Sequence, residues 1–294
     1  MRRDVRGSEA YWNKWVDYSV GRIKTMREKS DEPGDDDYLP QYLFELAIRH
    51  LVLMLERYSR GDDVRDLSRH FDGLLEAWEN AERLGRHVWN SETQFTRHSW
   101  AVNLDHYIDC FWLIGLALTL KIPDAEWQRL LILVGNEGED TLLDRVIASR
   151  QPDRKIGGKL CFPKAYQRLL DVVEAPKADQ SGKLRTFVEH WYPSLKNAGS
   201  PSFPPAYRTP YWYAYGDQNF QGGAYFGRWC IEAVAVATAF DIADTACLDH
   251  PNYPGDLRQD NRSPRYPDPE SAVPPLQPPP SAAKRGWLSR LLGK

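Results

Sequence analysis

Apolar residues recur along most of the chain at intervals of three and four positions, the spacing that places them on one face of an α-helix. Alternation with a period of two, which predicts strands, is not sustained over any useful length. The pattern therefore predicts an all-α protein, a multi-helix globular bundle of about nine helices. The expected helices cover residues 8–28, 38–60, 62–88, 94–121, 123–135, 138–150, 163–175, 178–192 and 223–242.

Breakers and changes in composition divide the chain into three expected parts. Pro123 suits the first turn of a new helix. A seam between two helical domains, residues 1–121 and 122–257, is therefore expected at this point. Ten of the 21 prolines lie in the last 44 residues. Because such a composition builds neither helix nor sheet, residues 258–294 are expected to form a disordered, proline-rich tail.

The tail ends in a short basic segment with an amphipathic pattern. As a helix it would place Trp287, Leu288, Leu291 and Leu292 beside four basic residues. Two interpretations stay open: a weak contact with a membrane surface or a partner, and a solubilised end without a fixed partner. No stretch reaches the roughly 18 apolar residues of a transmembrane helix. The first residues also lack the apolar region of a secretory signal.

The charge balance limits the class of partner. The chain has 38 Lys and Arg against 41 Asp and Glu, a net charge of −3. Residues 251–294 hold seven basic and four acidic residues, so this end carries +3 and the preceding body −6. An acidic body argues against direct nucleic-acid binding, which usually requires a basic patch. The four cysteines have no Cys-x-x-Cys spacing and indicate thiols in a reducing compartment, so a cytoplasmic location is expected.

The common catalytic signatures are absent from the sequence. No phosphate-binding loop, nucleophile elbow, zinc-protease motif or EF-hand occurs with its required spacing. His98, His106 and Asp109 could share one helix face, but a metal site needs three or four convergent ligands. We therefore expect no catalytic residue, no cofactor and no metal. A helical metal-dependent hydrolase using these three residues remains an alternative.

Acidic residues cluster at the expected start of the helix over 138–150. Glu137, Glu139 and Asp140 crowd this start, and Asp144 lies one helical turn after Asp140. Acids at a helix N-terminus stabilise the helix by about 0.3–1 kcal/mol each. The same four residues could instead form a negative patch that meets a basic partner surface. Both interpretations are open at this point.

An alanine-rich segment near the end of the body carries the most distinctive pattern. If residues 224–244 are helical, Tyr225, Trp229 and Glu232 fall on one face at spacings of four and three. A buried carboxylate is costly unless it is paired or hydrogen-bonded. Glu232 is therefore expected to have a partner in the core and a structural role.

This segment and the residues after it resemble the C-terminal domain of the PoNi family of immunity proteins. The matching positions are Tyr225-Phe226-Gly227, Trp229, Glu232-Ala233, Ala235-Val236-Ala237, His250-Pro251, Tyr253-Pro254 and Asp256-Leu257. Upstream, residues 138–144 and His190-Trp191-Tyr192 also resemble landmarks of the family. The N-terminal helices are similar in character to the family's N-terminal domain.

The resemblance implies a binding protein without an active site, which neutralises a PoNe-type DNase toxin. Many such toxins are delivered by type VI secretion during competition between bacteria. The helical body would cover the DNA-binding or catalytic cleft of the toxin, and its acidic charge suits a basic nuclease. The alternative to an immunity protein is a helical adaptor or scaffold, which would use the aromatic loop 203–220 and the tail.

The expected roles of individual residues follow from these arguments. The candidate toxin-binding residues are Glu137, Glu139, Asp140 and Asp144. The expected structural motif consists of Tyr225, Gly227, Trp229, Glu232, Tyr253 and Asp256. The expected partner is a cognate nuclease toxin, with no direct contact to nucleic acid and no transmembrane segment.

Overall fold

The computed structural model describes residues 2–32, 34–217 and 222–258, and among these residues it contains helices and no strands. The all-α prediction is thus confirmed. The α-helices are α1 Glu9–Ser30, α2 Leu39–Arg60, α3 His70–Val88, α4 Ser91–His98, α5 Leu104–Thr119, α6 Asp124–Val134, α7 Thr141–Ala148, α8 Pro163–Glu174, α9 Lys177–Leu195 and α10 Ile231–Ala239. Short 3₁₀ helices are η1 Val64–Arg69, η2 Pro205–Tyr207, η4 Thr245–Cys247 and η5 Gly255–Arg258.

Polar side chains before the first turns explain where several helices begin. The Ser8 hydroxyl accepts from the backbone N–H of Tyr11 at the start of α1. Asn90 and Asn103 cap α4 and α5 in the same way. Such caps satisfy backbone donors that have no partner within the helix. At the other end of α2, Gly61 adopts a left-handed conformation with φ of 103°, which favours glycine.

Two long helices expected from the sequence are interrupted. The apolar run over 94–121 forms α4 and α5, because the Asn103 side chain donates to the carbonyls of Thr96 and Arg97 and also caps α5. The expected helix over 223–242 contains α10 alone, so Tyr225 and Trp229 precede it in non-helical chain. The helix-face argument for these two residues was therefore wrong, although both are buried.

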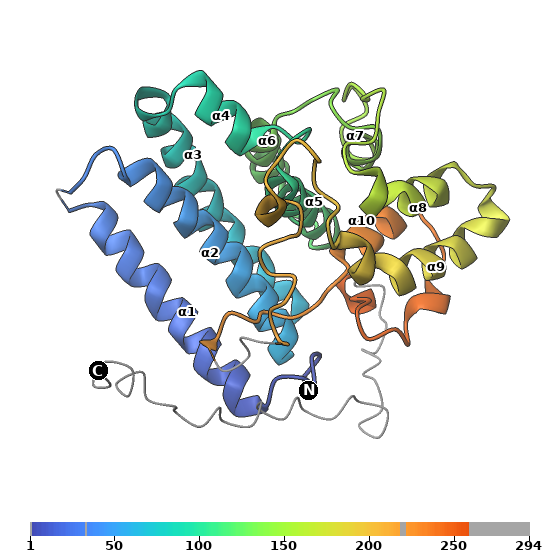
Figure 1. Ribbon diagram of the computed structural model, residues 1–294. Helices are drawn as coiled ribbons and strands as arrows, with labels where there is room; N and C mark the ends of the chain where they lie inside the picture. Colours follow the sequence, from blue (N-terminus) through green and yellow to red (C-terminus); the bar gives the residue numbers. More distant parts are fainter. Residues whose placement is uncertain (1, 33, 218–221, 259–294) are drawn as a thin grey trace, which may run out of the picture.

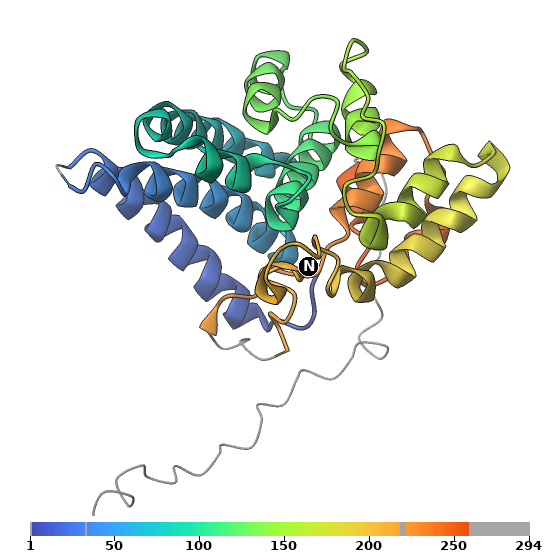
Figure 2. The same ribbon diagram turned by 45° about the horizontal axis from the view of Figure 1, so that its top comes forward.

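Two groups of helices lie on either side of α5 (Figures 1 and 2). In one group α2 packs between α1 and α3, and in the other α8 packs on α9. Helix α5 joins the groups by packing closely against α10, where Gly115 faces Ala235 and Ile231. A Cβ atom added at Gly115 would lie 2.9 Å from side-chain atoms of both neighbours, so close helix packing requires glycine here.

The main hydrophobic core extends from Met26 to Leu257 and includes side chains from both groups of helices, and a smaller cluster joins Tyr11, Trp12 and Tyr225. It continues across residues 121 and 122, and the expected division into two domains stays a prediction. None of the described helices is long and apolar enough to cross a membrane. The expected tail lies outside the described residues apart from Arg258, and so do Trp287, Leu288, Leu291 and Leu292.

The segment between α9 and α10 crosses the face of α5 and reaches α1 and α2 (Figure 1). It is fixed at its middle by Trp212, which is 3% exposed. The Trp212 ring lies 5.1 Å from the Trp112 ring of α5 and 6.2 Å from the Trp191 ring of α9, measured between centroids. Aromatic contacts therefore position a long loop beside the central helix.

Candidate functional site

The acidic turn, residues 137–140, precedes α7 and is partly buried. Asp140 and Asp144 are both fully buried. The Asp140 carboxylate caps α7 by accepting from the backbone N–H groups of Leu142 and Leu143. It also accepts from the Tyr107 hydroxyl at 3.1 Å and from the Cys161 N–H at 2.7 Å. Asp140 thus joins α5, α7 and the chain before α8.

Asp144 anchors the polar loop that follows α7. Its Oδ1 accepts from Arg154 Nε at 2.7 Å, and both side chains of this ion pair are buried. The other oxygen accepts from the backbone N–H groups of Gly138, Asp140 and Gly157. Burial raises the pKa of Asp144, while Arg154 opposes this rise.

These contacts correct the expectation that four acids form one surface patch. Asp140 and Asp144 have no exposed surface to offer a partner, because the turn folds over their carboxylates. Glu137 is exposed, and its carboxylate accepts from the backbone N–H of Lys155 at 2.7 Å. Glu139 is partly exposed. Only these two of the four residues reach the surface.

The sequence motif around Tyr225 ties the beginning of the chain to its end. The Tyr225 side chain is buried against Trp12 of α1. Its hydroxyl donates to the Asp4 carboxylate and accepts from the Arg6 guanidinium. The Tyr11 hydroxyl donates to the Tyr225 carbonyl at 2.8 Å. The motif thus connects residues 4–12, at the N-terminal end of the described chain, with the non-helical segment before α10.

Gly227 and Trp229 continue the connection to α2. The Trp229 indole donates to the Ser59 hydroxyl, which donates to the carbonyl of Phe226, both at 2.8 Å. Gly227 has φ of 109°, and a Cβ atom there would lie 2.4 Å from the Ser59 Oγ. Glycine is therefore required by both the conformation and the space.

Asp256 and Tyr253 lie near the C-terminal end of the described chain and contact residues of earlier segments. Asp256 pairs with Arg3 at 2.5 Å and accepts from the Tyr58 hydroxyl. Tyr253 is 5% exposed and donates to the buried Asp244 carboxylate at 2.6 Å. These side chains make interior contacts that hold helices and loops together.

Glu232 lies in the first turn of α10 and is fully buried. Its Oε1 accepts from the Tyr166 hydroxyl at 2.9 Å and from the Trp191 indole at 3.3 Å. Burial raises the pKa of Glu232, and the hydrogen bonds from Tyr166 and Trp191 oppose the rise. The carboxylate therefore connects α8, α9 and α10 at the centre of the C-terminal half.

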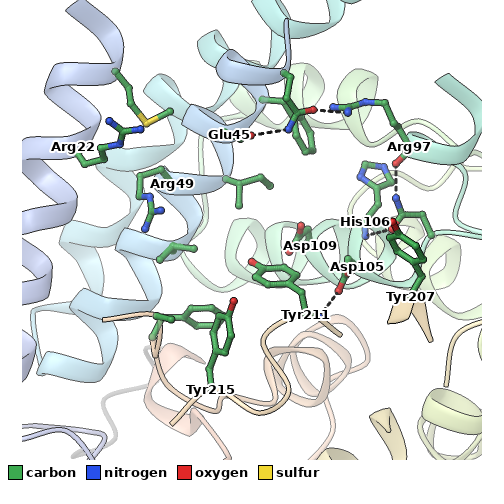
Figure 3. A pocket seen from close by; sticks show the side chains of 18 of the residues that line it. Arg22, Glu45, Arg49, Arg97, Asp105, His106, Asp109, Tyr207, Tyr211 and Tyr215 are labelled. Atoms are coloured by element: carbon green, nitrogen blue, oxygen red, sulfur yellow. Dashed lines mark hydrogen bonds between the residues drawn. The ribbon is translucent and has the colours of Figure 1, made fainter. Parts of the chain in front are cut away.

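A groove of about 540 Å³ opens between α2, α5 and the segment that crosses α5 (Figure 3). We call it the tyrosine groove, because Tyr207, Tyr211 and Tyr215 line one side of it. Its other walls come from α1, α2, α4 and α5. They include Arg22, Phe44, Glu45, Ile48, Arg49, Arg97, Asp105, His106 and Asp109.

Two acids of α5, Asp105 and Asp109, lie one helical turn apart in this groove. Asp105 accepts from the backbone N–H of Tyr211 at 3.2 Å. Burial raises the pKa of Asp105 to about 6. Asp109 is 8% exposed, and burial together with the neighbouring Asp105 raises its pKa well above the ordinary value.

The two histidines considered as metal ligands have other contacts. His98 pairs with Glu82 at 3.1 Å, whereas His106 Nε2 lies 3.5 Å from Cys110 Sγ. Burial lowers the pKa of His106 to about 3, so its imidazole is neutral. Within residues 2–32, 34–217 and 222–258, no three His, Cys, Asp or Glu side chains converge as a metal site would require. This geometry does not support the hydrolase alternative.

Sequence reasoning missed the tyrosine groove. Asp109 entered the sequence argument only as a metal ligand, and Asp105 did not enter it at all. The available signal was a pair of acids on an otherwise apolar helix, at a spacing of four. The loop tyrosines that complete the groove are about a hundred positions away, so their proximity to these acids emerges only from the fold.

Comparisons with known proteins give two family matches and a similar fold. Residues 3–132 match the family described as PoNe immunity protein (PoNi), N-terminal, and residues 138–257 match PoNe immunity proteins (PoNi), C-terminal. The crystal structure of protein PA2201 from Pseudomonas aeruginosa is similar, with a TM-score of 0.66 at 17% identity. The match covers 88% of this chain and 89% of that one, and concerns the fold alone. A comparison with curated proteins finds no match.

Proposed function

The chain belongs to the PoNe immunity protein (PoNi) family, and from this premise we propose that it binds and neutralises a cognate antibacterial DNase toxin. The observation that carries the proposal is the match of both halves of the chain, over residues 3–257, to the two parts of this family. The proposed partner is a PoNe-type nuclease delivered by type VI secretion. The immunity protein would act in the cytoplasm, where the DNA to be protected lies.

The proposed mechanism is occlusion of the nuclease cleft without catalysis by the immunity protein. A cleft that holds DNA must be positively charged to bind phosphates. The body of this protein carries a net charge of −6, which favours association with such a surface. We place Glu137 and Glu139 among the residues that could meet it, because both reach the surface at one turn.

The experiment is co-expression with a PoNe-type nuclease, for which the product of the adjacent gene is the first candidate to test. Cells that produce the active nuclease domain should survive with this protein and die without it. The purified proteins should form a complex whose affinity falls as salt is raised, because rim charges steer association. Death of the cells in the presence of this protein, or the absence of a complex with the nuclease, would contradict the proposed function.

The acidic turn is tested separately by reversing the charges of Glu137 and Glu139. Glu137→Lys combined with Glu139→Lys should slow association with the nuclease and reduce its salt dependence, while the melting temperature stays close to that of the wild type. Glu9→Lys combined with Asp17→Lys, on exposed positions of α1, makes the same change in net charge elsewhere. Equal effects of both pairs would show that net charge, and not this turn, controls the association.

A further inference from the structure

The tyrosine groove contains a buried carboxylate that pairs with no cation among the residues that the structure describes. Asp109 is more than nine-tenths buried and lines the groove (Figure 3). Across the described ranges, neither Asp105 nor Asp109 belongs to any ion pair, although both stand beside a space of about 540 Å³. The neighbouring charge that acts on Asp109 is Asp105, a second acid.

Other charged groups around the groove do not neutralise this pair. Arg97 is held by Gln41 and lies 4.0 Å from the Trp89 ring centroid. Arg22 and Arg49 line the part of the groove formed by α1 and α2, whereas Asp105 lies on the opposite side (Figure 3). Burial of acids without a cation is unfavourable. Burial therefore favours the neutral form of Asp109, and a cation supplied by a partner would stabilise its carboxylate form.

We propose that the tyrosine groove receives a lysine or arginine side chain of the nuclease toxin, which pairs with Asp105 and Asp109. This inference rests on the proposed function, since it names the site through which the toxin is held. The protein-borne cation is favoured over a free amine because the partner must present a basic DNA-binding surface.

The tyrosines around the acids suit the same occupant. Tyr207 and Tyr211 are 63% and 48% exposed, so both rings are accessible to a partner. Aromatic faces attract ammonium and guanidinium groups. Tyrosines at the edge of a pocket also exclude water from a charged pair at the centre of an interface. The groove thus combines an acidic floor with an aromatic wall.

The test replaces both acids by their amides and measures binding to the nuclease. Asp105→Asn combined with Asp109→Asn should weaken the complex by about 30-fold or more, mainly through faster dissociation. The variant should melt at the same temperature as the wild type or higher, because the amides remove the buried carboxylate of Asp109 and the partly buried one of Asp105. A merely structural role predicts the reverse, a lower melting temperature with unchanged affinity.

A matched control removes the same charge from the other side of the molecule. Asp171→Asn combined with Asp179→Asn changes exposed acids of α8 and α9. This control should bind the nuclease within about twofold of the wild type. If the groove variant binds as tightly as the control, the groove proposal fails while the proposed function stands. If the wild type itself neither binds the nuclease nor protects cells, both fail.

A divalent cation is the competing occupant, and the same variants test it. Magnesium or calcium chloride should not raise the melting temperature of the wild type more than that of the Asp105→Asn/Asp109→Asn protein. A stabilisation confined to the wild type, with toxin affinity equal in both proteins, would assign the acids to a metal ion and overturn the proposal.

Discussion

At the scale of single residues, the buried acids differ in how their charge is balanced. Asp144 has a guanidinium and three backbone donors, whereas no cation in the described part of the chain pairs with Asp109. A buried ion pair is strongly destabilised when one partner is removed, because the other charge stays in the interior. We therefore expect buried acids that pair with a cation to stabilise the fold. Buried acids without such a pair are expected to be available to a cationic partner.

Asp144→Asn should lower the free energy of unfolding by about 3–5 kcal/mol, because it leaves Arg154 buried without its counter-charge. Denaturant unfolding monitored by tryptophan fluorescence measures this loss. Glu137→Gln, an exposed acid of the same turn, should change stability by less than about 0.5 kcal/mol. Equal stability of the two variants would contradict the structural role assigned to Asp144.

Glu232→Ala should lower the free energy of unfolding by about 1–3 kcal/mol, because it leaves the Tyr166 hydroxyl and the Trp191 indole without their acceptor. The midpoint of chemical unfolding reports the change. Glu232→Gln keeps an acceptor oxygen at this position and should recover part of the loss. An unchanged midpoint for the alanine variant would show that these donors find other partners.

Glu56, which is 1% exposed, makes stability depend on pH in a defined direction. Burial raises the pKa of Glu56 to about 7. Because the folded state holds this proton more tightly than the unfolded state, the contribution of Glu56 to stability falls between about pH 4.5 and 7. Glu56→Gln should therefore be no more stable than the wild type at pH 4.5 and more stable at pH 8, by at most about 3 kcal/mol. Unfolding free energies measured across this range test the sign.

At the scale of elements, the helices that sequence spacing predicted well are those with an uninterrupted apolar stripe, such as α2 and α3. The prediction failed where a polar residue inside an apolar run acts as a cap, as Asn103 does. It failed again at Gly227, whose left-handed conformation delays the start of α10. The Asn103 side chain makes local hydrogen bonds to both flanking helices, whereas Gly227 packs against the distant Ser59. Apolar spacing expresses neither feature.

The candidate site was less accessible to sequence reasoning than the helices. The acidic turn was recognised, but its interior position depends on Arg154, which follows Asp144 by ten residues in a polar loop. A run of acids at a helix start has the same sequence pattern whether it faces solvent or the core. The shared groove of Asp109 and the loop tyrosines was inaccessible for a further reason, since no short-range pattern links α5 to the segment after α9.

Gly227 has a left-handed backbone conformation in the chain just before α10. Gly227→Ala should lower the free energy of unfolding by at least about 1–2 kcal/mol, because φ of 109° is strained for alanine. The added Cβ would also displace Ser59 and Trp229. Gly222→Ala, at an exposed glycine with open space around it, is the matched control and should have little effect. Thermal unfolding of both variants decides whether this turn is required.

At the scale of the whole molecule, the folded body is closed by residues near 257. Leu257 is fully buried, and Arg258 donates to the Ile242 carbonyl and pairs with Asp244 at 3.2 Å. Asp256 binds Arg3, so the end of the body contacts its beginning. These closing contacts therefore all lie within the chain up to Arg258.

A chain ending at Arg258 should fold with the melting temperature of the full protein and protect cells from the nuclease equally well. Proline-rich sequence offers little apolar surface for burial, so its removal takes little from the core. A chain ending at Asn252 is the contrasting variant. It lacks Tyr253, Asp256 and Leu257, and we expect it to unfold at lower temperature or fail to fold. Calorimetry and nuclease co-expression measure the two properties separately. Loss of protection in the chain ending at Arg258, with its melting temperature unchanged, would assign toxin binding to residues 259–294 and make their basic end a functional element.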